Sequence, residues 1–202
     1  IEADYSYQVE QNDNEIAVHL SAAGKTGALQ FITFNKTVRL RPGSSALKVD
    51  YLIENSFRSV TPLTYGFWFH NMALGPRGAS AFFLPSMSGI RQVNLTTATD
   101  EIRLRDPARG WIAGLAHNNQ TGLSVALDYK YFNLFSSWLG NLCVPTMDFK
   151  LHPVKIDAGS RFETSLAYLA FCGLNSVAGA ATELAGSLEI IPAPDKIRTG
   201  IS

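Results

Sequence analysis

Short stretches in which apolar and polar residues alternate recur along most of the chain. Residues 47–55 alternate with a period of two, so that every second residue lies on the same face of an extended strand. Residues 16–20 and 36–40 show the same pattern, and the Pro- and Gly-containing turn at 41–45 separates two of these stretches. The pattern predicts a protein built from many short β-strands.

Connections between the predicted strands are short and contain few helical signals. Residues 110–116 and 122–129 bracket the polar segment 117–121, which is typical of a β-hairpin. Only residues 131–139 and 177–184 have sequences compatible with a helix. Parallel strands need crossover connections of a dozen or more residues, which are usually helical. The sequence shows no such helical connections, which predicts antiparallel sheets. The expected fold is therefore all-β, a sandwich or a barrel with few or no helices.

The length and the ends of the chain bear on its organisation. A chain of 202 residues is long enough for one large domain, and we expect that domain to span residues 1–190, followed by a tail or linker at 191–202. The chain has no initiator Met and no signal peptide, which is typical of a mature form, a cleavage product or an excised domain. Its compartment stays open, with an extracellular or periplasmic location as part of a larger protein as one expectation.

The charge balance and the cysteines exclude several classes of function. Lys plus Arg and Asp plus Glu each number 17, so no basic surplus points to nucleic acid. No apolar run approaches the length of a transmembrane helix, so membrane insertion is not expected. Cys143 and Cys172 have apolar neighbours, which favours buried free thiols over a disulfide, and their spacing fits no metal motif. We expect no metal and no cofactor.

The aromatic run at residues 65–71 carries the most informative chemistry. It ends in His70 and Asn71, and Trp68 shares a face with His70 because the two residues are two apart in a strand. Aromatic rings stack on the C–H faces of sugars, and imidazole and amide groups pair with hydroxyls. The same run is also compatible with a buried strand that has a polar end.

Three segments in order resemble the galactose mutarotase-like (aldose 1-epimerase-like) β-supersandwich family. The resemblance covers roughly residues 30–175. It implies a large antiparallel β-sandwich whose concave face binds carbohydrate. The segments are the strand, Pro-Gly turn and strand of residues 36–55, the aromatic run with His70, and residues 142–160 with their Leu-Cys-Val-Pro and Gly-Ser motifs.

The chain departs from the family at the position of the catalytic base. Epimerases of this family have a glutamate directly before the proline of the late segment, and here that position is Val144. Asp148 lies three residues beyond Pro145 and would replace the glutamate only after a change of register. The family's second histidine has no clear counterpart, since His117 lies in the predicted hairpin loop. Classical mutarotation is therefore not expected, because proton transfer needs a base within reach.

The candidate site residues follow from the run and the resemblance. The catalytic candidates are His70 and Asp148, and the substrate-binding candidates are Trp68, Asn71, Arg91 and Trp138. Trp138 follows two serines in a segment that resembles a loop, and Arg91 has the geometry to bind a sugar carboxylate bidentately.

Each candidate also has a structural alternative. His70 and Asn71 suit a strand end, Trp68 suits the core, and Arg91 suits a solvated loop. Asp148 shares a face with His152 in a predicted strand, and the pair is either an acid–base pair, half of a metal site or an exposed polar face.

Three hypotheses about function remain open at this point. The first is a carbohydrate-binding domain of a larger carbohydrate-active protein. The second is a sugar epimerase or polysaccharide lyase-like enzyme that uses His70 and Asp148. The third is a structural or assembly domain with an aromatic interface. The expected partners are carbohydrate, a neighbouring domain or a second copy of the chain, and whether the chain is an enzyme is left open.

Overall fold

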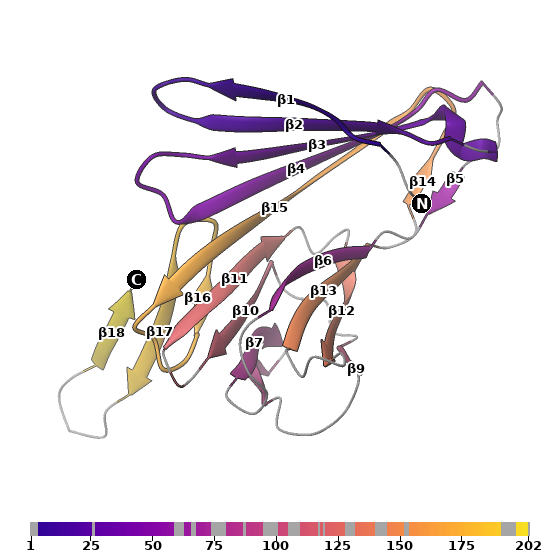
Figure 1. The fold of residues 1–202 in the computed structure, drawn as a ribbon. Helices are drawn as coiled ribbons and strands as arrows, with labels where there is room; N and C mark the ends of the chain where they lie inside the picture. The colour runs from indigo at the N-terminus through magenta and orange to yellow at the C-terminus, as the bar shows by residue number, and fades with distance from the viewer. Residues whose placement is uncertain are drawn as a thin grey trace.

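The computed structural model shows an all-β protein (Figure 1). It describes residues 4–25, 27–58, 63–65, 68–73, 80–86, 88–94, 101–104, 110–116, 118, 120–127, 132–139, 145–151, 154–190 and 197–201.

The largest element is an antiparallel nine-stranded sheet, and all its neighbouring strands pair in antiparallel register. Its strands, in spatial order, are β1 (Ser6–Gln11), β2 (Ile16–Ala23), β3 (Ile32–Leu40), β4 (Ala46–Asn55), β15 (Arg161–Cys172), β11 (Thr121–Leu127), β10 (Trp111–Ala116), β7 (Ser80–Ser86) and β8 (Gly89–Asn94).

Three smaller sheets complete the fold, and their strands also pair antiparallel. A four-stranded sheet contains β6 (Trp68–Ala73), β13 (Pro145–Leu151), β12 (Phe132–Leu139) and β9 (Glu101–Leu104). A two-stranded sheet contains β14 (Val154–Ile156) and β5 (Leu63–Tyr65). A three-stranded sheet contains β16 (Gly179–Ala180), β17 (Ala185–Ile190) and β18 (Ile197–Ile201).

The predicted all-β antiparallel class is confirmed. The only helical element among the described residues is the short 3-10 turn η1 (Gly27–Phe31). Residues 132–139 form strand β12, so the first of the two segments compatible with a helix is a strand. The second contains the two-residue strand β16, and the glycine within it weakens a helix. The predicted hairpin is present as β10 and β11, and β18 lies within the segment where a tail or linker is predicted.

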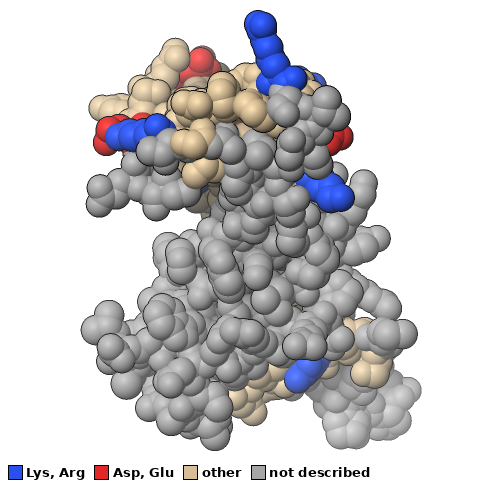
Figure 2. Space-filling view, turned by 90° about the vertical axis from the view of Figure 1, so that its right-hand side faces the viewer, with Lys and Arg blue, Asp and Glu red and all other residues tan. Residues whose placement is uncertain are grey.

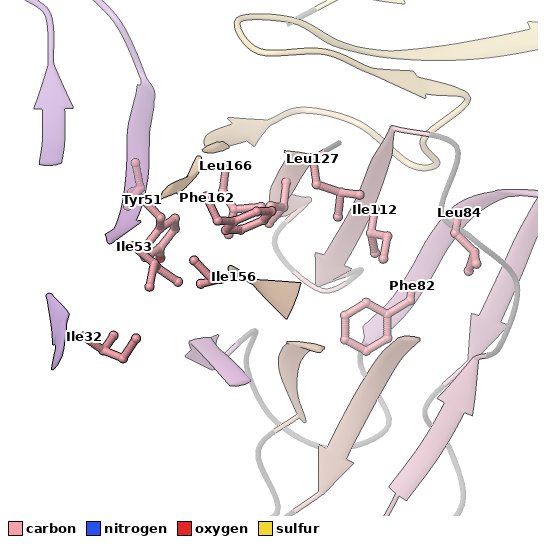
Figure 3. Close-up of a cluster of buried hydrophobic side chains, with 12 residues drawn as sticks. Ile32, Tyr51, Ile53, Phe82, Leu84, Ile112, Leu127, Ile156, Phe162 and Leu166 are labelled. Atoms are coloured by element: carbon pink, nitrogen blue, oxygen red, sulfur yellow. The ribbon is translucent and has the colours of Figure 1, made fainter. Parts of the chain in front are cut away.

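One hydrophobic cluster packs beneath the nine-stranded sheet (Figure 3). It joins the alternating residues Val49, Tyr51 and Ile53 of β4 to side chains from β7, β10, β11 and β15. Ile156 of β14 lies among them and is 1% exposed. Through Ile156, the cluster packs the two-stranded sheet against the nine-stranded one.

A second cluster covers the other face of the same sheet, over strands β7, β10 and the C-terminal half of β15. It includes Phe83, Trp111 and Phe171 from the strands, together with Leu174 and Val177 from the segment after β15. Strands β7 and β10 are therefore buried on both faces, which explains why their sequences are almost continuously apolar.

Asn55 joins two sequence motifs that lie far apart along the chain. Its side-chain Nδ2 donates hydrogen bonds to the carbonyl oxygens of Ile156 (2.9 Å) and Asp157 (3.3 Å). Its backbone N–H donates to the carbonyl oxygen of Ser160 (3.0 Å). The Asn that closes the early strand thus holds the late Gly-Ser turn, and at 2% exposure its polar groups need these partners.

Two further expectations concern the cysteines and the membrane. Cys172 is a free thiol at the end of β15 and is exposed, so the prediction that it is buried is wrong. Its position alternates with Phe171, whose side chain enters the second cluster, so Cys172 lies on the opposite face of β15, beyond Tyr168, the last residue there that packs against the first cluster. Within the part of the chain that the structure describes, no helix is long and apolar enough to cross a membrane.

Candidate functional site

The four-stranded sheet brings together five of the six predicted site residues. Trp68, His70 and Asn71 lie on β6, Asp148 lies on the adjacent strand β13, and Trp138 lies on β12 beyond it. β12 and β13 follow one another in the sequence, but β6 lies far from both, so only the folded sheet makes the residues of β6 neighbours of the others.

His70 and Asp148 stand directly opposite each other across β6 and β13. Asp148 stands opposite Ser136 of β12, and Ser136 stands opposite Arg103 of β9. The four residues form one row across the sheet, which we call the polar row. Directly opposite positions on antiparallel strands share a face, and with strands about 4.8 Å apart the row spans about 14 Å.

The adjacent row has the opposite chemical character. Phe69 is paired with Phe149, Phe149 with Phe135, and Phe135 with Leu104. Successive residues of a strand belong to opposite faces of a sheet. The alternation therefore separates an apolar face, which contains this row, from a face that contains the polar row. We call the second one the polar face.

The polar face also contains both predicted tryptophans. Trp68 is two residues before His70, and Trp138 is two residues after Ser136, so both occupy positions on this face. Its charged positions are balanced, with Lys150 and Arg103 against Asp148 and Glu101. Residue types with aromatic, imidazole, carboxylate, hydroxyl and guanidinium groups therefore occupy positions on one sheet face.

Asn71 lies at an irregularity of β6. The pairing passes from His70–Asp148 to Ala73–Thr146, so two residues of β6 stand against one residue of β13. Such a β-bulge twists and bends its strand locally, and bulges are frequent beside active sites. The bulge distinguishes Asn71 from the regular positions on either face.

Arg91 lies elsewhere. It belongs to β8, the edge strand of the nine-stranded sheet, where it is exposed and paired with Leu84 of β7. Arg91 is therefore not in the four-stranded sheet with the other five predicted site residues. Its role in sugar binding remains a prediction. His117, Val144 and His152 lie outside the described residues, and so does Cys143.

A second polar surface lies on the nine-stranded sheet. A shallow hollow of about 570 Å³ is lined by eight residues: Asn35, Thr37, Asp50, Tyr51, Leu52, Glu163, Thr164 and Ser165. Asp50 there is ion-paired with Arg39 and with Lys48. Figure 2 shows charged side chains of both signs on this upper part of the molecule. Because the charges pair with one another, this surface has the character of a solvated sheet face.

No group of three or more His, Cys, Asp or Glu side chains among the described residues is arranged to hold a metal ion.

Sequence reasoning missed Arg103 and Ser136, which complete the polar row. The segment around Arg103 reads as mixed loop and strand, and the segment around Ser136 is ambiguous between helix and strand. The alternation of polar and apolar residues in Phe135-Ser136 and Arg103-Leu104 is the available signal, but two residues are too few to establish a strand. The register between strands determines which residues form the polar row, and no short stretch of sequence reveals that register.

Comparison with known proteins gives information at the level of structure. No protein-family model matches the sequence, and no curated protein matches it. Among solved structures, the chain is similar to a galactose mutarotase-like protein from Lactobacillus casei, with a TM-score of 0.60, 9% identity, and coverage of 83% of this chain and 74% of that one. The chain has the galactose mutarotase-like fold.

Two other solved structures similar to this chain differ in length, and only one of them is named for an activity. The Slr1438 protein from Synechocystis sp. PCC 6803 matches with a TM-score of 0.63 and 8% identity, over 84% of this chain and 66% of that one. The alpha-N-acetylgalactosaminidase NagBb from Bifidobacterium bifidum, in complex with GalNAc, matches with a TM-score of 0.59 and 9% identity, over 84% of this chain and 28% of that one. The chain thus spans just under two thirds of the first protein and about a quarter of the second.

The galactose mutarotase-like fold is what the three sequence segments predict, and this prediction is confirmed. Identities near 10% establish shared architecture only, so the chemistry of this chain must be argued from its own residues. Those residues place the polar row, with its histidine and carboxylate, at the centre of the four-stranded sheet.

Proposed function

We propose that this chain is a carbohydrate-associated β-sandwich domain that binds a sugar or oligosaccharide on the polar face of the four-stranded sheet. The domain spans residues 1–190, with β18 paired to its strand β17, and belongs to a larger carbohydrate-active protein. The observation that carries the proposal is the polar row His70–Asp148–Ser136–Arg103, flanked by positions of two tryptophans.

The composition of the face supports a sugar as the ligand. A sugar ring offers C–H patches that stack on indole rings and hydroxyls that both donate and accept hydrogen bonds. Asp148 supplies acceptors, Arg103 supplies donors, and His70 and Ser136 supply both. The row has room for a ligand of one or two sugar rings, given its span of about 14 Å.

A glycan array followed by calorimetry tests the proposal. The array identifies a ligand, and Trp68→Ala and His70→Ala should each weaken its binding by about tenfold, the equivalent of one good hydrogen bond or stacking contact. His19→Ala is the matched control, because His19 lies on the nine-stranded sheet and is half-exposed. Unchanged binding in both variants would remove these residues from the site, and no binding to any glycan would leave the proposal without support.

One observation favours a second candidate function, a sugar epimerase or lyase-like enzyme. An acid–base pair needs two titratable groups near one substrate carbon, and His70 and Asp148 are direct partners in the register. In this reading His70 and Asp148 exchange protons with the sugar. Activity toward sugars that His70→Ala and Asp148→Asn both abolish, with binding retained, would favour the enzyme over the binding domain.

A further inference from the structure

The register between β6 and β13 at the polar row differs by one residue from the registers on either side of it. Tyr65 of β5 stands opposite Val154 of β14. Ala73 of β6 stands opposite Thr146 of β13. Eight residues separate the first members of these two pairs, and eight also separate the second members. The two flanking pairs are therefore in phase, and a regular antiparallel ladder would join them without any irregularity.

The pairs between these flanks are out of phase with both. A regular ladder would place Asn71 opposite Asp148 and His70 opposite Phe149. The structure instead pairs His70 with Asp148. The offset is taken up by one extra residue of β6 at the bulge, and by one extra residue of the facing chain at the other end. The pair at the centre of the polar row thus depends on two compensating irregularities.

The surroundings of this segment have fixed positions. Ile156 at the end of β14 is 1% exposed in the first cluster, and its carbonyl oxygen accepts a hydrogen bond from Asn55 Nδ2 (2.9 Å). Residues 145–150 of β13 keep a single register with β12. β6 is at the edge of the four-stranded sheet, and among the described residues it pairs only with β13. Residues 68–72 can therefore change register without disturbing the other described pairs.

The two registers have opposing advantages. The regular ladder would remove the bulge, which leaves a residue of β6 unpaired. It would also place Met72 opposite Met147. Against this, it would move Trp68 and His70 to the apolar face, where desolvation disfavours an imidazole. Because each register gains what the other loses, the sequence is compatible with both.

We propose that residues 68–72 exchange between these two registers, and that a ligand on the polar face selects the one seen here. The observed register places Trp68 and His70 on the polar face, and the regular one places Phe69 and Asn71 there. An indole and an imidazole bind a sugar differently from a phenyl ring and an amide, which gives the ligand different affinities for the two states. The selection by ligand rests on the proposed function, whereas the exchange itself does not.

Pairs of cysteines report the two registers separately. In a Cys172→Ser background, which removes the exposed native thiol, Phe69→Cys/Phe149→Cys closes a disulfide in the observed register, because directly opposed residues have Cα atoms about 5 Å apart. Phe69→Cys/Lys150→Cys closes one only in the regular ladder, because the observed register puts these two positions on opposite faces. Phe135→Cys/Lys150→Cys is the matched control, since β12 and β13 keep one register that separates its positions in the same way.

Oxidation without ligand should close both disulfides of position 69, and the control should form at least about tenfold more slowly than either. Closure with position 149 shows that the variant is folded, and peptide mapping identifies each bond. If the bond between positions 69 and 150 forms no faster than the control, the exchange is overturned.

The sugar found on the glycan array tests the selection. At saturation it should slow the bond between positions 69 and 150 by about tenfold relative to the bond between positions 69 and 149. An unchanged ratio with sugar bound would overturn the selection by ligand. If no sugar binds, the proposed function and the selection fail together, and the ligand-free rates still decide the exchange.

Discussion

His70 and Asp148 occupy directly opposite positions on β6 and β13, although 77 residues separate them in the sequence. The pair is continued by Ser136 and Arg103, and the neighbouring row is wholly apolar. An imidazole position and a carboxylate position side by side suit either hydrogen bonding to sugar hydroxyls or acid–base chemistry on a sugar.

Wild-type protein should not accelerate the exchange of galactose or glucose anomers. The sequence resemblance predicts Val144 at the position of the family's base, and a valine side chain can neither accept nor donate a proton. Proton NMR exchange spectroscopy on the sugar, with and without added protein, measures the rate of exchange between the anomers directly. Acceleration that His70→Ala removes would instead support the enzymatic candidate.

Asn55→Ala should destabilise the fold by about 2–4 kcal/mol, because it leaves one buried and two partly buried backbone groups without their side-chain partner. Those groups include the carbonyl of Ile156 and the N–H of Phe57, which donates to Asn55 Oδ1 at 2.9 Å. Urea unfolding measures the loss. Asn35→Ala is the control, because its hydrogen bond to Glu54 is exposed, and it should cost less than about 1 kcal/mol. Equal losses would contradict a special role for Asn55.

Gly122→Ala should also destabilise the protein, by about 1–3 kcal/mol, through overpacking. A Cβ at position 122 would lie 2.3 Å from the ring of Phe171 and 2.5 Å from the carbonyl oxygen of Gly114. The backbone oxygen cannot move away cheaply, and Phe171 is buried in the second cluster. Thermal unfolding measures the effect, and Gly122→Ala/Phe171→Leu should recover part of it. A neutral Gly122→Ala variant would show that the ring moves freely.

Stability should fall as the pH rises above about 10, the ordinary pKa of tyrosine. Burial raises the pKa of Tyr168 to about 12, and a hydrogen bond from Tyr51 lowers it in part. Burial also raises the pKa of Tyr51 well above its ordinary value, with the neighbouring Tyr168 as a further cause. The unfolded chain therefore loses protons that the folded chain keeps, and folding stability decreases with pH.

The expected slope is at most about 1.4 kcal/mol per pH unit for each tyrosine. Urea unfolding at a series of alkaline pH values measures it. Tyr168→Phe should reduce the slope between about pH 10 and 12, whereas Tyr7→Phe, at an exposed position, should not. An identical slope in both variants would mean that other groups control alkaline unfolding.

The fold class could be predicted from local patterns, because alternation and turn residues specify strands one at a time. The strand at 47–55, the hairpin and the absence of long helices among the described residues follow from such patterns. The burial of Cys172 was predicted wrongly, because apolar neighbours in sequence do not decide which face a residue occupies. Whether residues 177–184 form a helix also depended on tertiary packing against the second cluster.

The candidate site could be predicted only in part. His70 and Asp148 each stand out by residue type and by the resemblance, but their pairing depends on which strands become neighbours and in which register. Arg103 and Ser136 join them through that register alone. Register is set by long-range packing, and no short segment encodes it.

The three tryptophans of the chain provide the most direct test of sugar binding at the polar face. Trp68 and Trp138 occupy positions on that face, whereas Trp111 is buried in the second cluster. Titration of labelled protein with the sugar found on the array, followed through the indole N–H resonances, should shift the signals of Trp68 and Trp138 and leave that of Trp111 unchanged. A sugar that binds without moving either Trp68 or Trp138 would contradict a binding site on the polar face.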